Sequence, residues 1–181
     1  AKNQFFPWME AVIKYTEATH LSYNESGIQS WKDKGIDLKF RLVEEGQSPF
    51  GFDLLPEKLI PQIALGINDL GGTGSYSGQY IVASKKLKNV DLTLGIGWGK
   101  LGGEAHFSNP IEGLLSNFAP GGGSGGTLNI GQWFNTSDVA IFGGVEYFTP
   151  IPNLSVKLEY DPSDYKRELF IGHPLYWDEP Q

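Results

Sequence analysis

The segment KGIDLKFRLVE, residues 34–44, decides the predicted fold because apolar and charged side chains alternate along it. The apolar parity consists of Ile36, Leu38, Phe40 and Leu42. The charged parity consists of Asp37, Lys39 and Arg41. Successive side chains of a β-strand point to opposite faces of a sheet, so this alternation predicts a strand with one apolar face and one ionic face.

The same alternation returns twice later in the chain. In residues 90–98 the apolar parity consists of Val90, Leu92, Leu94, Ile96 and Trp98, and the polar parity of Asp91, Thr93, Gly95 and Gly97. In residues 154–161 the two parities are Leu154, Val156, Leu158 and Tyr160, and Ser155, Lys157, Glu159 and Asp161. Three such segments predict an all-β protein whose sheet has two chemically distinct faces.

Weaker alternation and the spacing of turn residues complete the predicted arrangement. We expect about eight strands, near residues 8–19, 34–44, 62–68, 76–85, 90–98, 128–134, 139–148 and 154–161. Residues 86–89 and 150–153 have the length of hairpin turns. The expected long loops and irregular tail are residues 46–61, 102–126 and 162–181. The prediction is one domain over residues 1–181, with antiparallel strands in up-and-down order.

Length and composition narrow the class of protein. The chain has 181 residues with 24 glycines and 13% aromatic residues, which favours a turn-rich β protein. Its formal net charge of -7 argues against a nucleic-acid partner, because a phosphate backbone requires a basic surface. Cysteine is absent, which excludes disulfide bonds and thiolate metal sites.

The sequence shows no pattern typical of a transmembrane helix or of a signal peptide. No stretch approaches the roughly 18 consecutive apolar residues of a transmembrane helix, so any crossing must use strands closed into a barrel. Residues 1–8 lack the basic start and apolar block of a signal peptide. We therefore expect that a leader has been removed or that the chain is an internal piece of a longer protein.

Alternation alone leaves open whether the apolar face meets a protein core or lipid, because a half-buried soluble sheet shows the same pattern. Three features favour a transmembrane β-barrel, or a portion of one. The polar faces mix charges with Gly, Thr and Ala, loop lengths alternate, and aromatic residues gather near predicted strand ends. These aromatic residues are Trp8, Trp31, Tyr76, Trp98, Tyr147, Phe148 and Tyr160.

A transmembrane barrel assigns one parity to lipid, because Lys or Arg on the lipid face at mid-bilayer costs about 2–4 kcal/mol. The expected lipid-facing residues are Ile36, Leu38, Phe40, Leu92, Leu94, Val156 and Leu158. The expected lumen-lining residues are Glu10, Lys14, Asp37, Lys39, Arg41, Lys85, Asp91, Glu146, Lys157 and Glu159. Opposed carboxylates in this set also fit a glycosidase. Cross-strand ion pairs explain them more simply, because each acid has a basic neighbour of the same parity.

The remaining motifs do not predict a catalytic, metal or cofactor site. Residues 69–74 superficially resemble a phosphate-binding loop, but no Gly-Lys-Ser/Thr and no helix follow. A tight turn is the better interpretation, with Asp69 accepting hydrogen bonds from nearby amides and Gly71, Gly72, Thr73 and Gly74 completing it. His20, His106 and His173 lie far apart and lack a second ligand at metal spacing.

Several longer strings identify a family resemblance. They are FPWMEAVIKYT (6–16), KDKGIDLKFRLVEEG (32–46), PQIALGINDLGGTG (61–74), QYIVASKK (79–86), DLTLGIGWGKLG (91–102), FGGVEYFTP (142–150) and LSVKLEYDPSDY (154–165). Together they resemble the YjbH-like exopolysaccharide-biosynthesis family of Gram-negative outer-membrane proteins. The resemblance implies a β-barrel and a role in producing or exporting an extracellular polysaccharide. It supplies no catalytic residues, and family members are longer than this chain.

The expected function is therefore that of a non-enzymatic outer-membrane β-barrel of a Gram-negative cell, without a cofactor. Its polar lumen would serve as a path or docking surface for exopolysaccharide, and its partners would be outer-membrane lipid, the polysaccharide and other secretion proteins. Two alternatives remain open. One is a scaffold that binds secretion proteins through residues 46–61 and 102–126. The other is a soluble carbohydrate-binding β-sandwich in which Trp31, Trp98 or Trp133 stacks on sugar rings.

Overall fold

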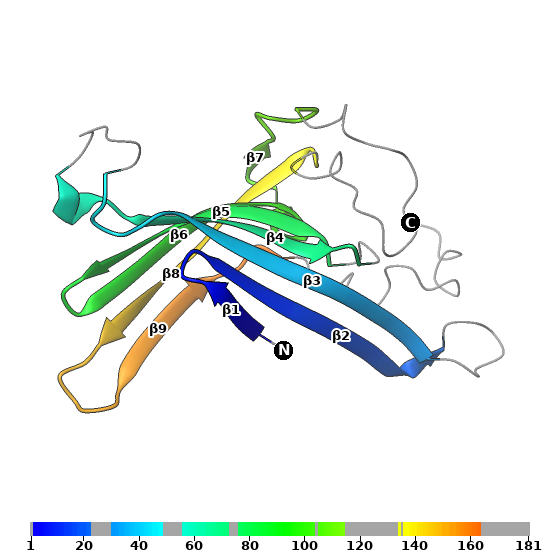
Figure 1. Cartoon of the computed structure of the whole chain (residues 1–181), viewed down its shortest axis with the longest axis horizontal. Coiled ribbons are helices and arrows are strands. Elements are labelled where there is room, and N and C mark those ends of the chain that lie inside the picture. The colour runs from blue at the N-terminus through cyan, green and yellow to red at the C-terminus, as the bar shows by residue number, and fades with distance from the viewer. Residues whose placement is uncertain are drawn as a thin grey trace.

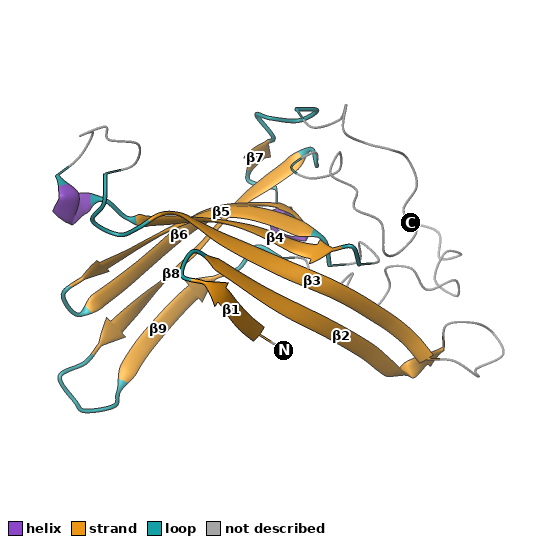
Figure 2. Ribbon diagram, viewed as in Figure 1, coloured by secondary structure: helices purple, strands orange, loops and turns teal. Residues whose placement is uncertain are grey.

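The computed structural model describes residues 2–22, 30–48, 56–72, 76–103, 105–114, 134 and 136–163. These residues form nine strands (Figures 1 and 2). The strands are β1 (Lys2–Phe6), β2 (Met9–Ser22), β3 (Ser30–Val43), β4 (Gln62–Leu70), β5 (Gly78–Leu87), β6 (Val90–Gly99), β7 (Phe107–Ser108), β8 (Asp138–Phe148) and β9 (Ser155–Tyr160). Two short 3-10 helices, η2 (Glu57–Leu59) and η3 (Lys100–Gly102), are the only helices of the described residues.

All nine strands belong to one antiparallel sheet. The sheet order β1-β2-β3-β4-β5-β6-β8 follows the chain, and β7 and β9 pair with different parts of β8. The sheet is curled into an open half-barrel, and the β2–β3 hairpin extends beyond its other strands (Figure 1). The all-β, antiparallel, up-and-down prediction is therefore confirmed.

No helix in the described ranges is both long enough and apolar enough to span a membrane.

Strict alternation located the strands well. The predicted strands at 34–44, 90–98 and 154–161 correspond to β3, β6 and β9. β1 was not predicted, and neither was β7, which lies within the expected loop 102–126 and is too short to display a period. The strand predicted at 128–134 falls outside the described residues except for Phe134, which lies in a turn.

Glycines on the polar parity leave room for aromatic rings of the neighbouring strands. A Cβ atom on Gly66 would lie 2.0 Å from the ring of Tyr80, and one on Gly95 would lie 2.2 Å from the ring of Phe142. The two rings, from β5 and β8, meet edge to face across β6 with centroids 5.9 Å apart. Side chains from strands on both sides of β6 thus converge on this face, as expected for the concave side of a curled sheet.

The contact between Gly95 and Phe142 yields a test of this packing. Replacing Gly95 with Ala should lower the free energy of unfolding by about 1–3 kcal/mol, because the new Cβ overlaps the Phe142 ring. In a Phe142→Leu background, which removes the far ring atoms, the same replacement should cost much less. Denaturant unfolding followed by circular dichroism measures both. Equal costs in the two backgrounds would contradict the packing, since residues in contact normally couple by about 0.5–3 kcal/mol.

Candidate functional site

Strand register sorts the side chains into two faces, because residues directly opposite in an antiparallel sheet point to the same side. Asp91 lies opposite Glu146, which lies opposite Lys157 on its other side. The neighbouring row holds Leu92, Val145 and Leu158. Polar residues from β6, β8 and β9 therefore share one face, and apolar residues share the other.

The apolar face is largely exposed. Leu94 is 63% exposed and Leu158 is 73% exposed, although both carry the side chains that ordinarily fill a core. Ile36, Leu92 and Val156 are exposed as well, whereas Leu38 and Phe40 are half-buried. Within the described sheet, these residues do not converge on a dry centre. Their assignment to lipid stays a prediction, but their exposure agrees with it.

Ion pairs join predicted lumen residues across neighbouring strands. Lys14 on β2 contacts Asp37 on β3 at 2.7 Å, and Lys157 on β9 contacts Glu146 on β8 at 3.3 Å. Register also places Glu10 opposite Lys39. These contacts fit the ion-pair interpretation of the carboxylates. They lie on the polar face, where the surrounding strands screen them from bulk water only in part.

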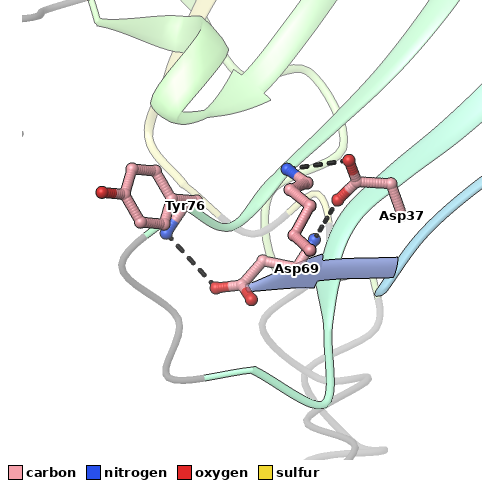
Figure 3. Close-up of polar contacts among 4 residues, drawn as sticks. Asp37, Asp69 and Tyr76 are labelled. Carbon is pink, nitrogen blue, oxygen red and sulfur yellow. Dashed lines mark hydrogen bonds and ion pairs between the residues drawn. The ribbon is translucent and has the colours of Figure 1, made fainter. Parts of the chain in front are cut away.

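Asp69 anchors the polar face to the turn after β4 (Figure 3). It is 7% exposed and has a φ of 60°, in the left-handed region that Asp tolerates better than most residues. Its backbone N–H donates to Asp37 Oδ1 at 3.0 Å, and its Oδ2 accepts from the Tyr76 N–H at 3.2 Å. Asp37 thereby links Asp69 to Lys14. Gly35 and Gly72 leave room for the Asp69 carboxylate.

The described part of residues 69–74 agrees with the turn interpretation, since the Gly72 N–H donates to the Asp69 carbonyl at 3.3 Å. Gly71 has a φ of 69° and open space around it, as a turn glycine requires. Thr73 and Gly74 lie outside the described residues.

A cavity of about 490 Å³ lies on the polar face. It lies over β6, β8 and β9, and Ser84 on β5 reaches its margin. Its lining includes four predicted lumen residues, namely Asp91, Glu146, Lys157 and Glu159. The volume falls in the range of about 300–1,000 Å³ that small-molecule sites occupy. Other predicted lumen residues, on β2 and β3, lie on the same face but outside this cavity.

Lys85 is a correction to the predicted lumen set. Register places it opposite Leu92, on the face that also carries Ile81, because its parity is that of the apolar residues of β5. Its ammonium group contacts Glu45 at 2.9 Å and donates to the Ile60 carbonyl at 3.2 Å. The hydrogen bond from Lys85 holds the pKa of the Glu45 carboxyl below its usual range. Lys85 therefore secures the loop after β3 and does not line the polar face.

Trp98 is a correction to the sugar-stacking alternative. Its side chain is 2% exposed, and its indole N–H donates to Asn109 Oδ1 at 3.0 Å. Phe134 packs edge to face against it, with ring centroids 5.0 Å apart. Trp98 thus has no face open to a sugar. The side chains of Trp31 and Trp133 lie outside the described residues.

The described residues contain no group of three or more His, Asp or Glu side chains arranged to hold a metal ion. His106 instead bridges strands: its Nδ1 accepts from the Ile141 N–H at 2.9 Å, and its Nε2 lies 2.9 Å from the Tyr160 hydroxyl. The side chains of His20 and His173 fall outside the described residues.

Comparison with known proteins identifies the family. Residues 1–173 match the YjbH family model, described as "Exopolysaccharide biosynthesis protein YbjH". The chain belongs to the YjbH family. It is 37% identical over 176 residues to a protein of Escherichia coli (strain K12) described as "Uncharacterized lipoprotein YjbH". The match covers 93% of this chain and 24% of that protein, so the chain spans about a quarter of its relative. No solved structure matches the chain.

The contacts of several residues of this YjbH-family chain were not predicted from the sequence. Asn109 receives the Trp98 N–H and donates to the carbonyls of Phe134 and Thr136, at 2.6 and 2.8 Å. His106 bridges β8 and β9. These partners lie 11 to 54 residues apart in the chain, and no local pattern signals such contacts.

Asp69 offers a test of the polar network. Asp69→Ala should lower the free energy of unfolding by about 1–3 kcal/mol, because the partly buried Tyr76 N–H loses its acceptor. Asp69→Asn should cost less, since Asn keeps a side-chain oxygen and tolerates a positive φ. Asp138→Ala, at an exposed strand end, is the control and should change the stability by no more than about 0.5 kcal/mol. Equal losses for Asp69→Ala and Asp138→Ala in denaturant unfolding would contradict the anchoring role.

Proposed function

We propose that this chain forms part of the wall of an outer-membrane β-barrel that acts in exopolysaccharide production in a Gram-negative cell. The apolar face of the sheet contacts lipid. The concave polar face provides a path or a docking surface for the polysaccharide, and the protein has no enzymatic role. One observation carries the proposal. Aliphatic side chains of the kind that fill a protein core are exposed on the apolar face of the sheet, and the charged side chains of β6, β8 and β9 lie on the polar face.

The distribution of charge on the apolar face supports contact with lipid. The apolar parity of β6 and of β9 carries no charged residue from Leu92 to Trp98 or from Val156 to Tyr160. The charges that do share this face lie toward strand ends. Lys85 binds the loop after β3. Glu17, Lys32 and Lys34 lie on the part of the β2–β3 hairpin beyond the last β3–β4 pair, Ile36–Leu70. Strand ends are where a membrane barrel meets the headgroup region.

Exposed apolar surface is costly in water. Soluble monomers seldom expose contiguous apolar patches larger than a few hundred Å². Exposed aliphatic or aromatic side chains on this sheet come from β2, β3, β5, β6, β8 and β9, with Ile13, Ile36, Ile81, Leu94, Ile141 and Leu158 as examples. A surface of this extent requires a covering, and hydrocarbon supplies one without demanding a matching protein surface.

The family and the relative support the biological setting. The family description names exopolysaccharide biosynthesis, which supports a role for this chain in the same process. The printed name of the E. coli relative contains the word lipoprotein, which supports a location in the cell envelope. Because the chain spans about a quarter of that relative, the activity of the whole protein is part of the proposal.

The soluble-sandwich alternative loses its main support. The described strands form one sheet, whereas a sandwich packs two sheets face to face. Trp98, one of its three candidate stacking residues, is buried. The scaffold alternative differs in what covers the apolar face, namely a partner protein in place of lipid.

Arginine substitution at matched leucines tests the proposal. Leu94 on β6 is 63% exposed, and Leu114 in the segment after β7 is 66% exposed. If hydrocarbon covers the apolar face, Leu94→Arg should cost about 2–4 kcal/mol of stability in a bilayer, whereas Leu114→Arg should cost almost nothing. In a gene-deletion strain, Leu94→Arg should reduce both the protein in the outer-membrane fraction and the secreted exopolysaccharide.

If water covers the face, both substitutions should stay within about 0.5 kcal/mol, which would contradict the lipid assignment. If Leu94→Arg leaves the protein in the outer membrane but releases a co-purifying protein, the result supports the scaffold alternative over contact with lipid. Unchanged exopolysaccharide secretion in the deletion strain itself would contradict the role in its production.

A further inference from the structure

The lining of the cavity on the polar face includes Gly144, which carries no side chain. Gly144 lies between Thr93 on β6 and Glu159 on β9 in a single row across the sheet. The row on one side holds Asp91, Glu146 and Lys157, and the row on the other side holds Gly95 and Phe142. Gly144 therefore leaves a gap in the middle of longer side chains, and the cavity of about 490 Å³ forms over it.

The side chains around Gly144 are held in place by contacts with their neighbours. Phe142 is fixed edge to face against Tyr80, and its ring lies over Gly95. On the opposite side, Glu146 and Lys157 hold each other at 3.3 Å. Thr93 Oγ1 lies 3.2 Å from Ser84 Oγ at the margin. One wall is thus an aromatic ring, and the other walls are hydrogen-bonding groups with restricted freedom.

Within the described residues, two carboxylates of the lining lack a hydrogen-bonding or ion-pair partner. Asp91 and Glu159 make no ion pair or hydrogen bond in the described ranges, whereas the Lys157 ammonium is engaged with Glu146. Asp161 also lines the cavity and accepts from the Ser163 N–H at 2.9 Å. Among its lining residues, four carboxylates share the cavity with one lysine, Lys157. Lys86 lies opposite Asp91 on β5, outside the lining, with its ammonium group 5.0 Å from the centre of the Phe148 ring.

We propose that this cavity, the Gly144 pocket, is a subsite for one sugar unit without an acidic group, and that a sugar bearing a protonated amine binds best. The assignment rests on the proposed function and specifies which polysaccharide chemistry the polar face accepts. Ionised carboxylates only accept hydrogen bonds, so hydroxyl and ammonium groups are their natural partners. The apolar face of a sugar ring packs against Phe142. A uronic acid would bring a like charge against Asp91 and Glu159.

Binding of three defined tetrasaccharides to the full-length protein in nanodiscs tests the proposal. The probes are tetramers of glucosamine, glucose and galacturonic acid, titrated at slightly acidic pH and followed by saturation-transfer NMR. The expected order of affinity is glucosamine above glucose, with no binding of galacturonic acid. Glu159→Gln keeps the size of the side chain but removes its charge, and should weaken glucosamine binding at least about fivefold. Glu57→Gln, on the exposed helix η2, is the matched control and should not change it.

Gly144→Val provides a second variant, because it fills the gap and should abolish binding of both glucosamine and glucose. A Cβ on Gly144 would lie 3.1 Å from the Leu158 carbonyl oxygen and 3.2 Å from Glu159 Cγ. The variant therefore also presses on the Glu159 side chain, and its fold is checked by circular dichroism. Glu159→Gln keeps the test decisive if Gly144→Val is unstable. Three outcomes would each overturn the subsite. They are an affinity for the galacturonic acid tetramer equal to that for the glucosamine tetramer, no binding of any probe, and glucosamine binding unchanged by Glu159→Gln.

Failure of the subsite is distinguishable from failure of the proposed function. Nanodiscs carrying Leu94→Arg and Leu114→Arg are measured beside the binding experiment. If the two arginine variants differ in stability as expected while the sugars do not bind, only the Gly144 pocket is refuted. If the arginine variants behave alike, the lipid-facing wall is refuted whatever the sugars do.

Discussion

The unbroken antiparallel pairing of β6 with β5 and β8 is the constraint on which the rest of the structure depends. Every residue from Val90 to Trp98 has a partner on β8, and no bulge interrupts either ladder. Because side chains alternate with a period of two, a slip of one residue would exchange the two faces completely. The position of Asp91 beside Glu146, the position of Thr93 beside Gly144 and the continuity of the apolar face from β5 to β8 all require this one register.

Curvature gives the two faces different roles. On the concave side, Gly66 and Gly95 admit the rings of Tyr80 and Phe142, so side chains from separate strands meet and leave the cavity over Gly144 between rigid walls. On the convex side, the same curl spreads neighbouring side chains apart, and large apolar residues such as Leu158 remain 73% exposed. Within the described residues, a single curled sheet thus separates a polar face from an apolar face.

The sequence was sufficient for the features that depend on local periodicity. Alternation located β3, β6 and β9 and sorted Asp91, Glu146 and Lys157 from Leu92 and Leu158 correctly. It failed where the decisive partner is distant. The face of Lys85 follows from its parity, but its contacts with Glu45 and Ile60 come from a loop whose course no pattern predicts. The burial of Trp98 likewise depends on Asn109 and Phe134, and the Gly144 pocket depends on a register between three strands.

A cysteine scan along β6 tests the central claim most directly, and the absence of native cysteine in the 181 residues allows single labels. Spin labels at successive positions from Val90 to Trp98, in nanodiscs, report collision with oxygen, which concentrates in lipid, and with a water-soluble nickel complex. The account predicts a period of two from Val90 to Ile96, with Leu92 and Leu94 accessible to oxygen and Asp91 and Thr93 to nickel. Accessibility without alternation, or nickel access at Leu94 equal to that at Thr93, would contradict it.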